Sequence, residues 1–204
     1  YDLAYLYCLP NMTIMCPADE AELVHMTNTA AFFDDGPIAL RYPRGSGTGV
    51  AIPEQAKRLT IGEARIINHG ENLAILSIGT MLETCKEVIT ILAKNRGVNA
   101  TLVDARFAKP LDTKMINKLC TTHSSLLIVE EGAPGGFAAQ VLQYIVNSGK
   151  LESQLRLRVA TLPDKIIDHA ERDIQLESAG LDVLGILKLS ESLISDQKNM
   201  VTIA

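Results

Sequence analysis

Two arginines at the end of a short apolar run carry the clearest chemical signal in the chain. In the stretch IALRYPRGSG, Arg41 and Arg44 flank a Tyr-Pro pair, and Gly45 follows at once. Ligands in open α/β sheets bind beyond the carboxyl ends of strands, where a guanidinium can hold a phosphate or carboxylate through two hydrogen bonds. Side chains alternate along a strand, so only one arginine should face a given pocket. Arg44 is the candidate anion-binding residue, and a contact with the linker or with an acidic neighbour is the structural alternative.

A glycine-rich turn, EEGAPGGF at residues 130–137, is a second candidate. It lies between an expected buried strand and an expected helix, where a helix N-terminus can hold a phosphate. The stretch matches neither G-x-G-x-x-G nor the P-loop pattern. Tight packing of strand on helix is therefore the favoured role of its glycines, with phosphate binding as the alternative. Glu130 and Glu131 are neighbours on a strand and face opposite ways, which argues against a paired-carboxylate site.

The histidines and cysteines show no metal-ligand spacing, and no G-x-S-x-G nucleophile motif occurs. Each histidine is expected to be solvated or structural, with His169 a candidate cap or interface donor because it stands just before a helix. Cysteines this far apart are typical of buried, small hydrophobic side chains in a reducing compartment. These residues are His25, His69, His123 and His169, and Cys8, Cys16, Cys85 and Cys120.

The composition favours a globular, water-soluble chain. With 204 residues, of which 47% are hydrophobic, the chain can form one large or two small domains with a sizeable core. The net charge of −5 argues against a nucleic-acid partner. No apolar run approaches the roughly 20 residues of a membrane-spanning helix.

Apolar runs and turn residues divide the chain into two blocks. In the first, residues 1–49, we expect a buried strand at Met12–Met15, a helix starting near Asp19 and a strand at Ile38–Tyr42. Asp19 and Glu22 are spaced as a capping pair. A strand, a helix and a strand in such short succession form a βαβ unit, so this sheet should be parallel.

The first block is expected to be incomplete. Two strands and one helix cannot cover both faces of a parallel sheet, and an open sheet edge favours association. The chain opens on Tyr1 without an initiator methionine, which suggests the tail of a longer protein. We therefore expect the missing strands to come from residues upstream of Tyr1 or from another chain.

A linker at residues 50–59 leads into the second block at 60–195, and a tail follows at 196–204. The block contains, in order, EARIIN, NLAILSIG, a helix from about Met81 to Lys94, NATLVDAR, the helix DTKMINKLCTTH, SSLLIVEE, a helix ending at Asn147, LRLRVATLP, and one or two short helices after Glu171. This alternation of strand and helix patterns predicts a complete α/β domain with helices on both faces of its sheet.

Several stretches occur in an order that resembles the C-terminal third of the 1-deoxy-D-xylulose-5-phosphate synthases, thiamin-diphosphate enzymes of the transketolase superfamily. RYPRG followed by VDARFAKPLD is typical of the superfamily, whereas PDKIIDH and AGLD favour the synthases. The resemblance covers almost the whole chain apart from the final SDQKNMVTIA. It implies an α/β fold: the end of a parallel-sheet pyrimidine-binding domain, followed by a transketolase C-terminal-like domain.

The resemblance also implies a reaction and its cofactors. These enzymes use thiamin diphosphate and Mg²⁺ to condense pyruvate with glyceraldehyde 3-phosphate, which yields CO2 and a precursor of isoprenoids, thiamin and pyridoxal. Arg44 matches the family arginine that binds the phosphate of the aldehyde. The family's G-D-G…N metal motif, its activating glutamate and its D-x-x-x-H loop have no match here. The chain is therefore expected to hold no catalytic, cofactor-binding or metal-binding residue and to be inactive alone.

The expected partners are the upstream part of the same polypeptide, a second subunit in a homodimer and the two small substrates, with no nucleic acid and no membrane. The expected compartment is the bacterial cytoplasm, with a plastid as the alternative. One further assignment is another superfamily enzyme, such as transketolase or the beta subunit of a 2-oxoacid dehydrogenase E1 component. Another is a non-catalytic module for dimer packing or regulation.

Overall fold

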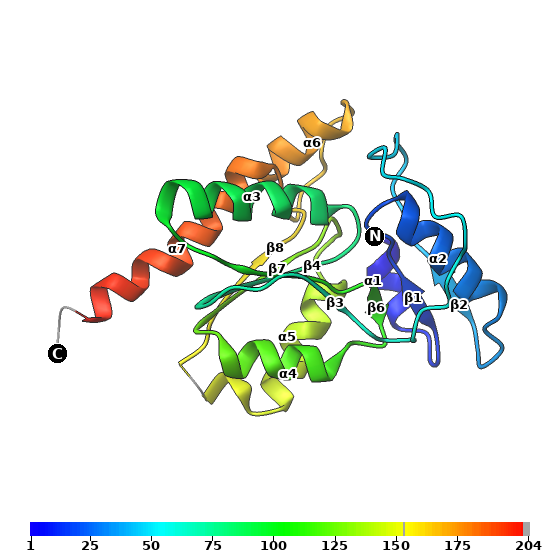
Figure 1. The fold of residues 1–204 in the computed structure, drawn as a ribbon, viewed down its shortest axis with the longest axis horizontal. Helices are drawn as coiled ribbons and strands as arrows, with labels where there is room; N and C mark the ends of the chain where they lie inside the picture. The colour runs from blue at the N-terminus through cyan, green and yellow to red at the C-terminus, as the bar shows by residue number, and fades with distance from the viewer. Residues whose placement is uncertain (153, 202–204) are drawn as a thin grey trace.

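The chain forms two β-sheets of unequal size that lie next to each other (Figure 1). The computed structural model describes residues 1–152 and 154–201. The smaller sheet has the strand order β2-β1-β6, and the larger sheet has the order β3-β5-β4-β7-β8. The smaller sheet belongs mainly to the first sequence block and the larger sheet to the second.

The smaller sheet contains the predicted βαβ unit. β1 (Thr13–Met15) and β2 (Ile38–Leu40) pair in parallel, and the helix α2 (Glu20–Ala31) connects them. The short helix α1 (Asp2–Tyr7), which the sequence patterns did not predict, precedes this unit.

One strand that we expected from upstream residues or another chain comes instead from the second block. β6 (Phe107–Lys109) pairs with β1 in the antiparallel direction. The side chain of Phe107 is buried in a small core with Met15 and Met26, and this burial stabilises the crossing of the chain into the first block. The smaller sheet is therefore mixed, because β6 adds an antiparallel strand to a parallel pair.

The larger sheet lies between two layers of helices, as the sequence predicted (Figure 1). Its strands are β3 (Arg65–Asn68), β4 (Leu73–Ser77), β5 (Thr101–Asp104), β7 (Ser125–Val129) and β8 (Arg156–Ala160). β3 is antiparallel to β5, and the other neighbours are parallel. The helices α3 (Met81–Arg96), α6 (Arg172–Ala179) and α7 (Val183–Val201) lie on one side, and α4 (Thr113–Thr122), α5 (Phe137–Asn147) and the 3-10 helix η1 (Lys150–Glu152) on the other.

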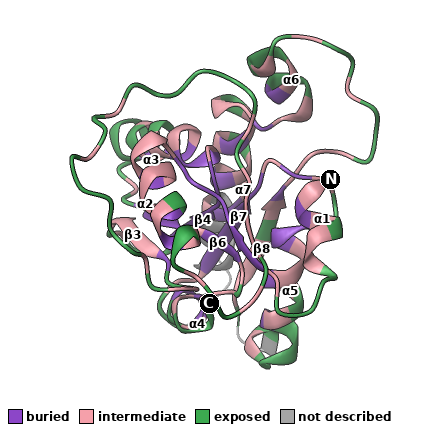
Figure 2. Cartoon of the chain, turned by 90° about the vertical axis from the view of Figure 1, so that its right-hand side faces the viewer, coloured by how far each residue is buried: buried purple, intermediate pink, exposed green. Residues whose placement is uncertain are grey.

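The central strands are buried on both faces, which explains their unbroken apolar sequences (Figure 2). In β4, Leu73 and Ile75 pack in the core on the α3 and α7 side. Ala74 and Leu76 pack in the core on the α4 and α5 side, which also includes Ile14 of the first block. The two blocks therefore share one of their hydrophobic cores.

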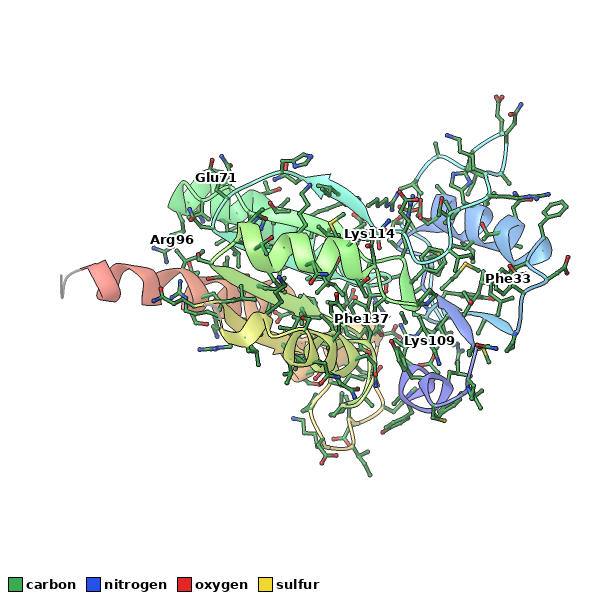
Figure 3. The ribbon with its side chains drawn as sticks, turned by 90° about the horizontal axis from the view of Figure 1, so that it is seen from below. Phe33, Glu71, Arg96, Lys109, Lys114 and Phe137 are labelled. Atoms are coloured by element: carbon green, nitrogen blue, oxygen red, sulfur yellow. The ribbon has the colours of Figure 1, made fainter. Side chains whose placement is uncertain are left out.

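The junction between the blocks is packed along its length. Lys109 lies close to α1 (Figure 3), and its ammonium group donates to the carbonyl oxygens of Tyr7 and Leu9 at 3.0 and 2.6 Å. The predicted linker runs against α2, because the Lys57 amide donates to the ring of His25 at 3.1 Å. The linker is therefore ordered by the first block, although its residues form neither helix nor strand.

Three of the four cysteines are buried as predicted, but Cys8 is exposed. Cys8 directly follows α1, whose buried residue, Leu3, lies near the other end of the helix. The boundary predicted at 195 falls inside α7, which continues to Val201. Within the described residues, no helix is both long enough and apolar enough to span a membrane.

Candidate functional site

A pocket of about 480 Å³ opens where the parallel strands β1 and β2 of the smaller sheet end, next to the end of β4 of the larger sheet. Its walls come from residues 17–20 after β1, residues 42–48 after β2 and Thr80 after β4, together with Leu23 of α2. The carboxyl ends of parallel strands are the common location of ligand sites in α/β folds. The position of the pocket therefore agrees with the site that the sequence predicted after β2.

Arg44 lies in the wall of this pocket and is exposed to solvent. Among the residues that the structure describes, Arg44 has no hydrogen bond or ion pair, so the structural alternative of an ion pair with an acidic neighbour finds no support there. Tyr42, whose exposed fraction is 60%, lines the same pocket. A guanidinium of this kind can bind an anion without first losing an internal partner.

Arg41 has a structural position, as the sequence indicated when it assigned only Arg44 to the pocket. The Arg41 guanidinium donates to the Asp2 carboxylate at 3.1 Å and to the Glu131 carbonyl oxygen at 2.7 Å. The strand ends at Leu40, so side-chain alternation does not extend to Arg44. The two arginines separate because the chain leaves the sheet between them.

The glycine-rich turn encloses one of the chain's own carboxylates. Glu130, which is 0% exposed, accepts hydrogen bonds from the backbone amides of Phe137 and Ala138 at 3.0 and 2.8 Å. A Cβ atom at Gly132 or Gly136 would overlap this carboxylate. The anion at the N-terminus of α5 is therefore Glu130 itself, and the alternative of phosphate binding at this turn is wrong.

Glu130 and Glu131 both follow the end of β7 at Val129, so the strand alternation expected for them does not apply, and Glu131 joins a different group of polar side chains. It forms an ion pair with Arg172 of α6, and the Arg172 guanidinium also donates to the Thr80 hydroxyl at 3.0 Å. Thr80 lines the Arg44 pocket, whereas Glu131 and Arg172 line a larger cavity of about 860 Å³ beside Tyr1. This group therefore lies between the two cavities and fixes the start of α6.

A buried cluster of charges joins the two blocks, and sequence reasoning missed it. Glu22 accepts two hydrogen bonds from the Arg106 guanidinium at 2.8 and 3.0 Å, and one from Arg65 at 2.8 Å. Asp104 accepts from Arg65 at 2.9 Å and from the backbone amide of Arg106 at 3.0 Å. Burial raises the pKa of Asp104 to about 6, although the Arg65 charge acts in the opposite direction. The cluster is a structural link between α2, β3 and β5.

This cluster also corrects the predicted capping pair. The Asp19 side chain caps α2 by accepting from the Glu22 amide at 2.8 Å, but the Glu22 side chain turns to the arginines instead of to Asp19. Arg106 adopts φ 58°, a left-handed conformation that is uncommon outside glycine, and its paired contacts with Glu22 compensate for it. The stretch VDARFAKPLD contains Asp104 and Arg106, yet its spacing gives no sign of a partner 84 residues away.

The histidines lie apart, as expected from their spacing. The ring of His25 accepts from the linker, and the ring of His123 contacts the Thr101 hydroxyl at 2.8 Å. His169 is exposed, and α6 begins after Glu171 without a side-chain cap, so His169 does not cap this helix. In residues 1–152 and 154–201, no three His, Cys, Asp or Glu side chains gather as a metal site would need.

Two family models together match most of the chain. The model described as transketolase, C-terminal domain, matches residues 62–186, and the model described as transketolase, pyrimidine binding domain, matches residues 1–48. The protein named 1-deoxy-D-xylulose-5-phosphate synthase 2 from Jannaschia sp. (strain CCS1) is 52% identical over 181 residues. The matched part is 89% of this chain and 28% of that protein, so the chain spans less than a third of this relative's length.

A solved structure titled split gene transketolase, inactive beta4 tetramer, has the same fold. Its TM-score is 0.78 at 22% identity, over 95% of this chain and 61% of that one. The strand order and the two helix layers described above therefore recur in a protein of low sequence identity. Because the C-terminal-domain model alone covers more than half of its residues, the chain belongs to the transketolase family.

Proposed function

We propose that this chain is the C-terminal part of a thiamin-diphosphate-dependent transferase that condenses pyruvate with glyceraldehyde 3-phosphate to 1-deoxy-D-xylulose 5-phosphate and CO2. In this proposal Arg44 binds the phosphate group of the aldehyde. The identity of 52% with a protein named as such a synthase supports the assignment. The order of RYPRG and VDARFAKPLD in the sequence supports it as well.

The main support for the proposal is the position of the Arg44 side chain and its lack of a hydrogen-bond partner among the described residues. Its guanidinium is exposed in the wall of a pocket at the carboxyl ends of β1, β2 and β4, and it has no partner among the described residues. A phosphate in this pocket would accept two parallel hydrogen bonds from it. The charge-assisted contact as a whole is expected to contribute about 1.5–3 kcal/mol.

The residues of this chain do not fit the diphosphate of the cofactor and its metal. Magnesium in such sites is bound by carboxylate groups together with phosphate oxygens, and in residues 1–152 and 154–201 no three acidic, histidine or cysteine side chains are grouped so that they could hold a metal ion. We therefore derive no step through the cofactor. The proposal assigns thiamin diphosphate and Mg²⁺ to upstream residues of the parent enzyme, a bacterial cytoplasmic homodimer, and assigns no activity to the chain alone.

The test is a kinetic comparison in the full-length protein that contains this chain. Arg44→Ala should raise the KM for glyceraldehyde 3-phosphate by about 10-fold to 100-fold, which corresponds to the loss of one charge-assisted contact. The KM for pyruvate should stay within about twofold, because a contact with the aldehyde's phosphate is absent from the pyruvate complex. Activity with unphosphorylated glyceraldehyde should be unaffected.

Arg58→Ala is the matched control. Arg58 is an exposed arginine of the linker that stacks on the Phe32 ring at 3.7 Å, and it does not line the Arg44 pocket. Its replacement removes the same charge and should leave both KM values unchanged. Equal effects of Arg44→Ala on the two substrates would show that Arg44 is not the phosphate anchor. A full-length protein that turns over transketolase substrates instead would favour the other superfamily assignment.

A further inference from the structure

The loop that carries Arg44 is held at both ends. On its N-terminal side, the Arg41 amide donates to the Met15 carbonyl oxygen at 2.8 Å, and the Arg41 side chain is bound to Asp2 and to the Glu131 carbonyl oxygen. On its C-terminal side, the only side chain of another element that binds residues 45–49 in the described structure is Glu20. Arg44 lies between these two fixed points.

Glu20 binds the loop through both of its carboxylate oxygens. Oε1 accepts from the backbone amide of Gly49 at 2.7 Å, and Oε2 accepts from the Thr48 hydroxyl at 2.8 Å. These hydrogen bonds are charge-assisted, a kind that is roughly twice as strong as its neutral counterpart. The Gly49 amide, the Glu20 backbone amide and the Thr48 hydroxyl together lower the pKa of Glu20 to about 2, so its carboxylate is fully charged at neutral pH.

The backbone of the loop passes directly against this carboxylate. A Cβ atom at Gly47 would overlap the Glu20 side chain, although the backbone of Gly47 has no left-handed φ that would itself require glycine. The glycine at position 47 is therefore explained by the close approach of Glu20. Glu20, Gly47, Thr48 and Arg44 all line the same pocket.

We propose that Glu20 is a positioning residue for the phosphate-binding arginine: it holds the loop at Thr48 and Gly49 so that the Arg44 guanidinium stays at the rim of the pocket. This inference rests on the proposed function of Arg44. Glu20 does not touch the substrate in this proposal and acts only through the loop. An arginine on a loop held at both ends loses less conformational entropy when it binds a phosphate.

Glu20 could also act in the opposite way, by repelling the substrate, and the direction of the KM change distinguishes the two effects. A carboxylate in the wall of a phosphate pocket repels the substrate, because like charges at short range destabilise each other. If repulsion dominated, neutralising Glu20 would lower the KM for the phosphorylated aldehyde. If the loop contact dominates, the same change raises it.

The experiment uses Glu20→Gln and Thr48→Val in the full-length protein. Glu20→Gln should raise the KM for glyceraldehyde 3-phosphate about threefold to tenfold, and Thr48→Val about twofold to threefold, in line with the loss of loop hydrogen bonds. The kcat and the KM for pyruvate should not change. Glu54→Gln, which removes the same charge from an exposed linker residue, is the matched control.

A second readout does not depend on activity. Trypsin cleaves after arginine, and Arg44 is followed by Gly45 in an exposed loop. Since proteolysis requires local opening of the loop, Glu20→Gln should accelerate cleavage after Arg44 several-fold, while cleavage at sites in the larger domain stays at the wild-type rate. Glu20→Gln in an Arg44→Ala background should add little to the KM change.

The outcomes separate the two proposals. If Arg44→Ala leaves the KM for the aldehyde unchanged while Glu20→Gln accelerates cleavage, the proposed function fails and the loop contact stands. If Arg44→Ala has its expected effect but Glu20→Gln changes neither the KM nor the cleavage rate, the positioning role of Glu20 is wrong. A lower KM in Glu20→Gln also overturns it, in favour of repulsion.

Discussion

Two glycine-rich segments of this molecule each wrap around a glutamate, with different consequences. In the turn at 130–138, Glu130 accepts from two backbone amides at the start of α5. In the loop at 44–49, Glu20 accepts from one amide and one hydroxyl. In both segments a glycine lies where a Cβ atom would overlap the carboxylate. The chemistry is the same, and the difference is burial.

Burial decides whether such a segment can serve a ligand. Glu130 is completely enclosed, so its turn is a closed unit that fixes α5 on the sheet. Glu20 is partly exposed, and its loop places Arg44 beside an open pocket. A glycine-rich sequence therefore does not by itself reveal whether the anion it accommodates belongs to the protein or to a substrate.

The largest expected effect comes from removing the buried carboxylate. Glu130→Ala leaves the amides of Phe137 and Ala138 without a partner in the core, and each unsatisfied buried group costs about 1–3 kcal/mol. The free energy of unfolding should fall by about 3–5 kcal/mol once the cavity left by the side chain is included. Urea unfolding followed by circular dichroism measures it.

Glu131→Ala is the neighbouring control. Glu131 is only partly buried and pairs with Arg172, so its removal should cost about 1 kcal/mol. Equal costs at the two positions would mean that the amides at the start of α5 find water when Glu130 is absent. The contrast between a closed turn and an open loop would then be weaker than the structure indicates.

A smaller effect is expected from adding one methyl group to each segment. Gly136→Ala should destabilise the protein by about 1–3 kcal/mol, because the new Cβ overlaps a buried carboxylate that cannot move. Gly47→Ala overlaps the partly exposed carboxylate of Glu20, which can turn into solvent, so the free energy of unfolding should stay within about 0.5 kcal/mol of wild type. Its cost should appear instead as faster trypsin cleavage after Arg44.

Thermal unfolding of the two alanine variants measured side by side tests this contrast. Loss of stability in Gly47→Ala as large as that in Gly136→Ala would show that Glu20 is as rigid as Glu130, despite its exposure. Wild-type stability in Gly136→Ala would show that the turn has room to relax.

The sequence predicted most of the elements because their signals are local. β4 and β7 are continuous apolar runs, and α3 ends where Gly97 adopts a left-handed φ of 65°. The strand β6 could not be predicted in its place, because its three residues pair with β1 more than 90 residues earlier in the chain. No local pattern distinguishes a short strand of the second block that crosses into the first.

In the candidate site, too, local sequence patterns indicated some residues, whereas long-range contacts involve others that no pattern indicated. Arg44 could be chosen as a candidate from the sequence because a strand end, two arginines and a glycine are neighbours there. Glu20 was not singled out from the sequence, because its contacts with Thr48 and Gly49 span 28 and 29 residues. Glu22 was assigned to a cap, although its partners are arginines of the second block. The sequence around acidic residues at a helix start does not show which of their side chains will bind residues far away in the chain.

The smallest expected effect is the pH dependence of the two glutamates, which should have opposite signs. Burial raises the pKa of Glu130 above its ordinary value of 4.5, even though the amides of Ala138 and Phe137 act to lower it. The folded protein then binds this proton more tightly than the unfolded chain, so the contribution of Glu130 to stability falls as the pH rises from about 4.5 through its folded pKa. Hydrogen bonds from the Gly49 amide, the Glu20 amide and the Thr48 hydroxyl lower the pKa of Glu20 to about 2. Its loop contact therefore persists above pH 4.5 and is lost only as the pH falls towards 2.

Carboxyl-carbon chemical shifts of the two glutamates, followed by NMR between pH 7 and pH 2.5, show in one titration which of the two groups begins to bind a proton first. The Glu20 resonance should still be unshifted at pH 3, whereas the Glu130 resonance should already have moved above pH 4.5. Thr48→Val removes one donor and should raise the pKa of Glu20 without affecting that of Glu130, which separates the loop contact from any general charge effect. If both carboxylates titrated near 4.5, neither would be held as the structure describes, since a donor set that fixes a charged group must change its proton affinity. Opposite pKa shifts would instead show that the same principle applies to both glycine-rich segments. In each, hydrogen-bond donors of the chain hold a carboxylate, and the exposure of that carboxylate to water decides whether its pKa rises or falls.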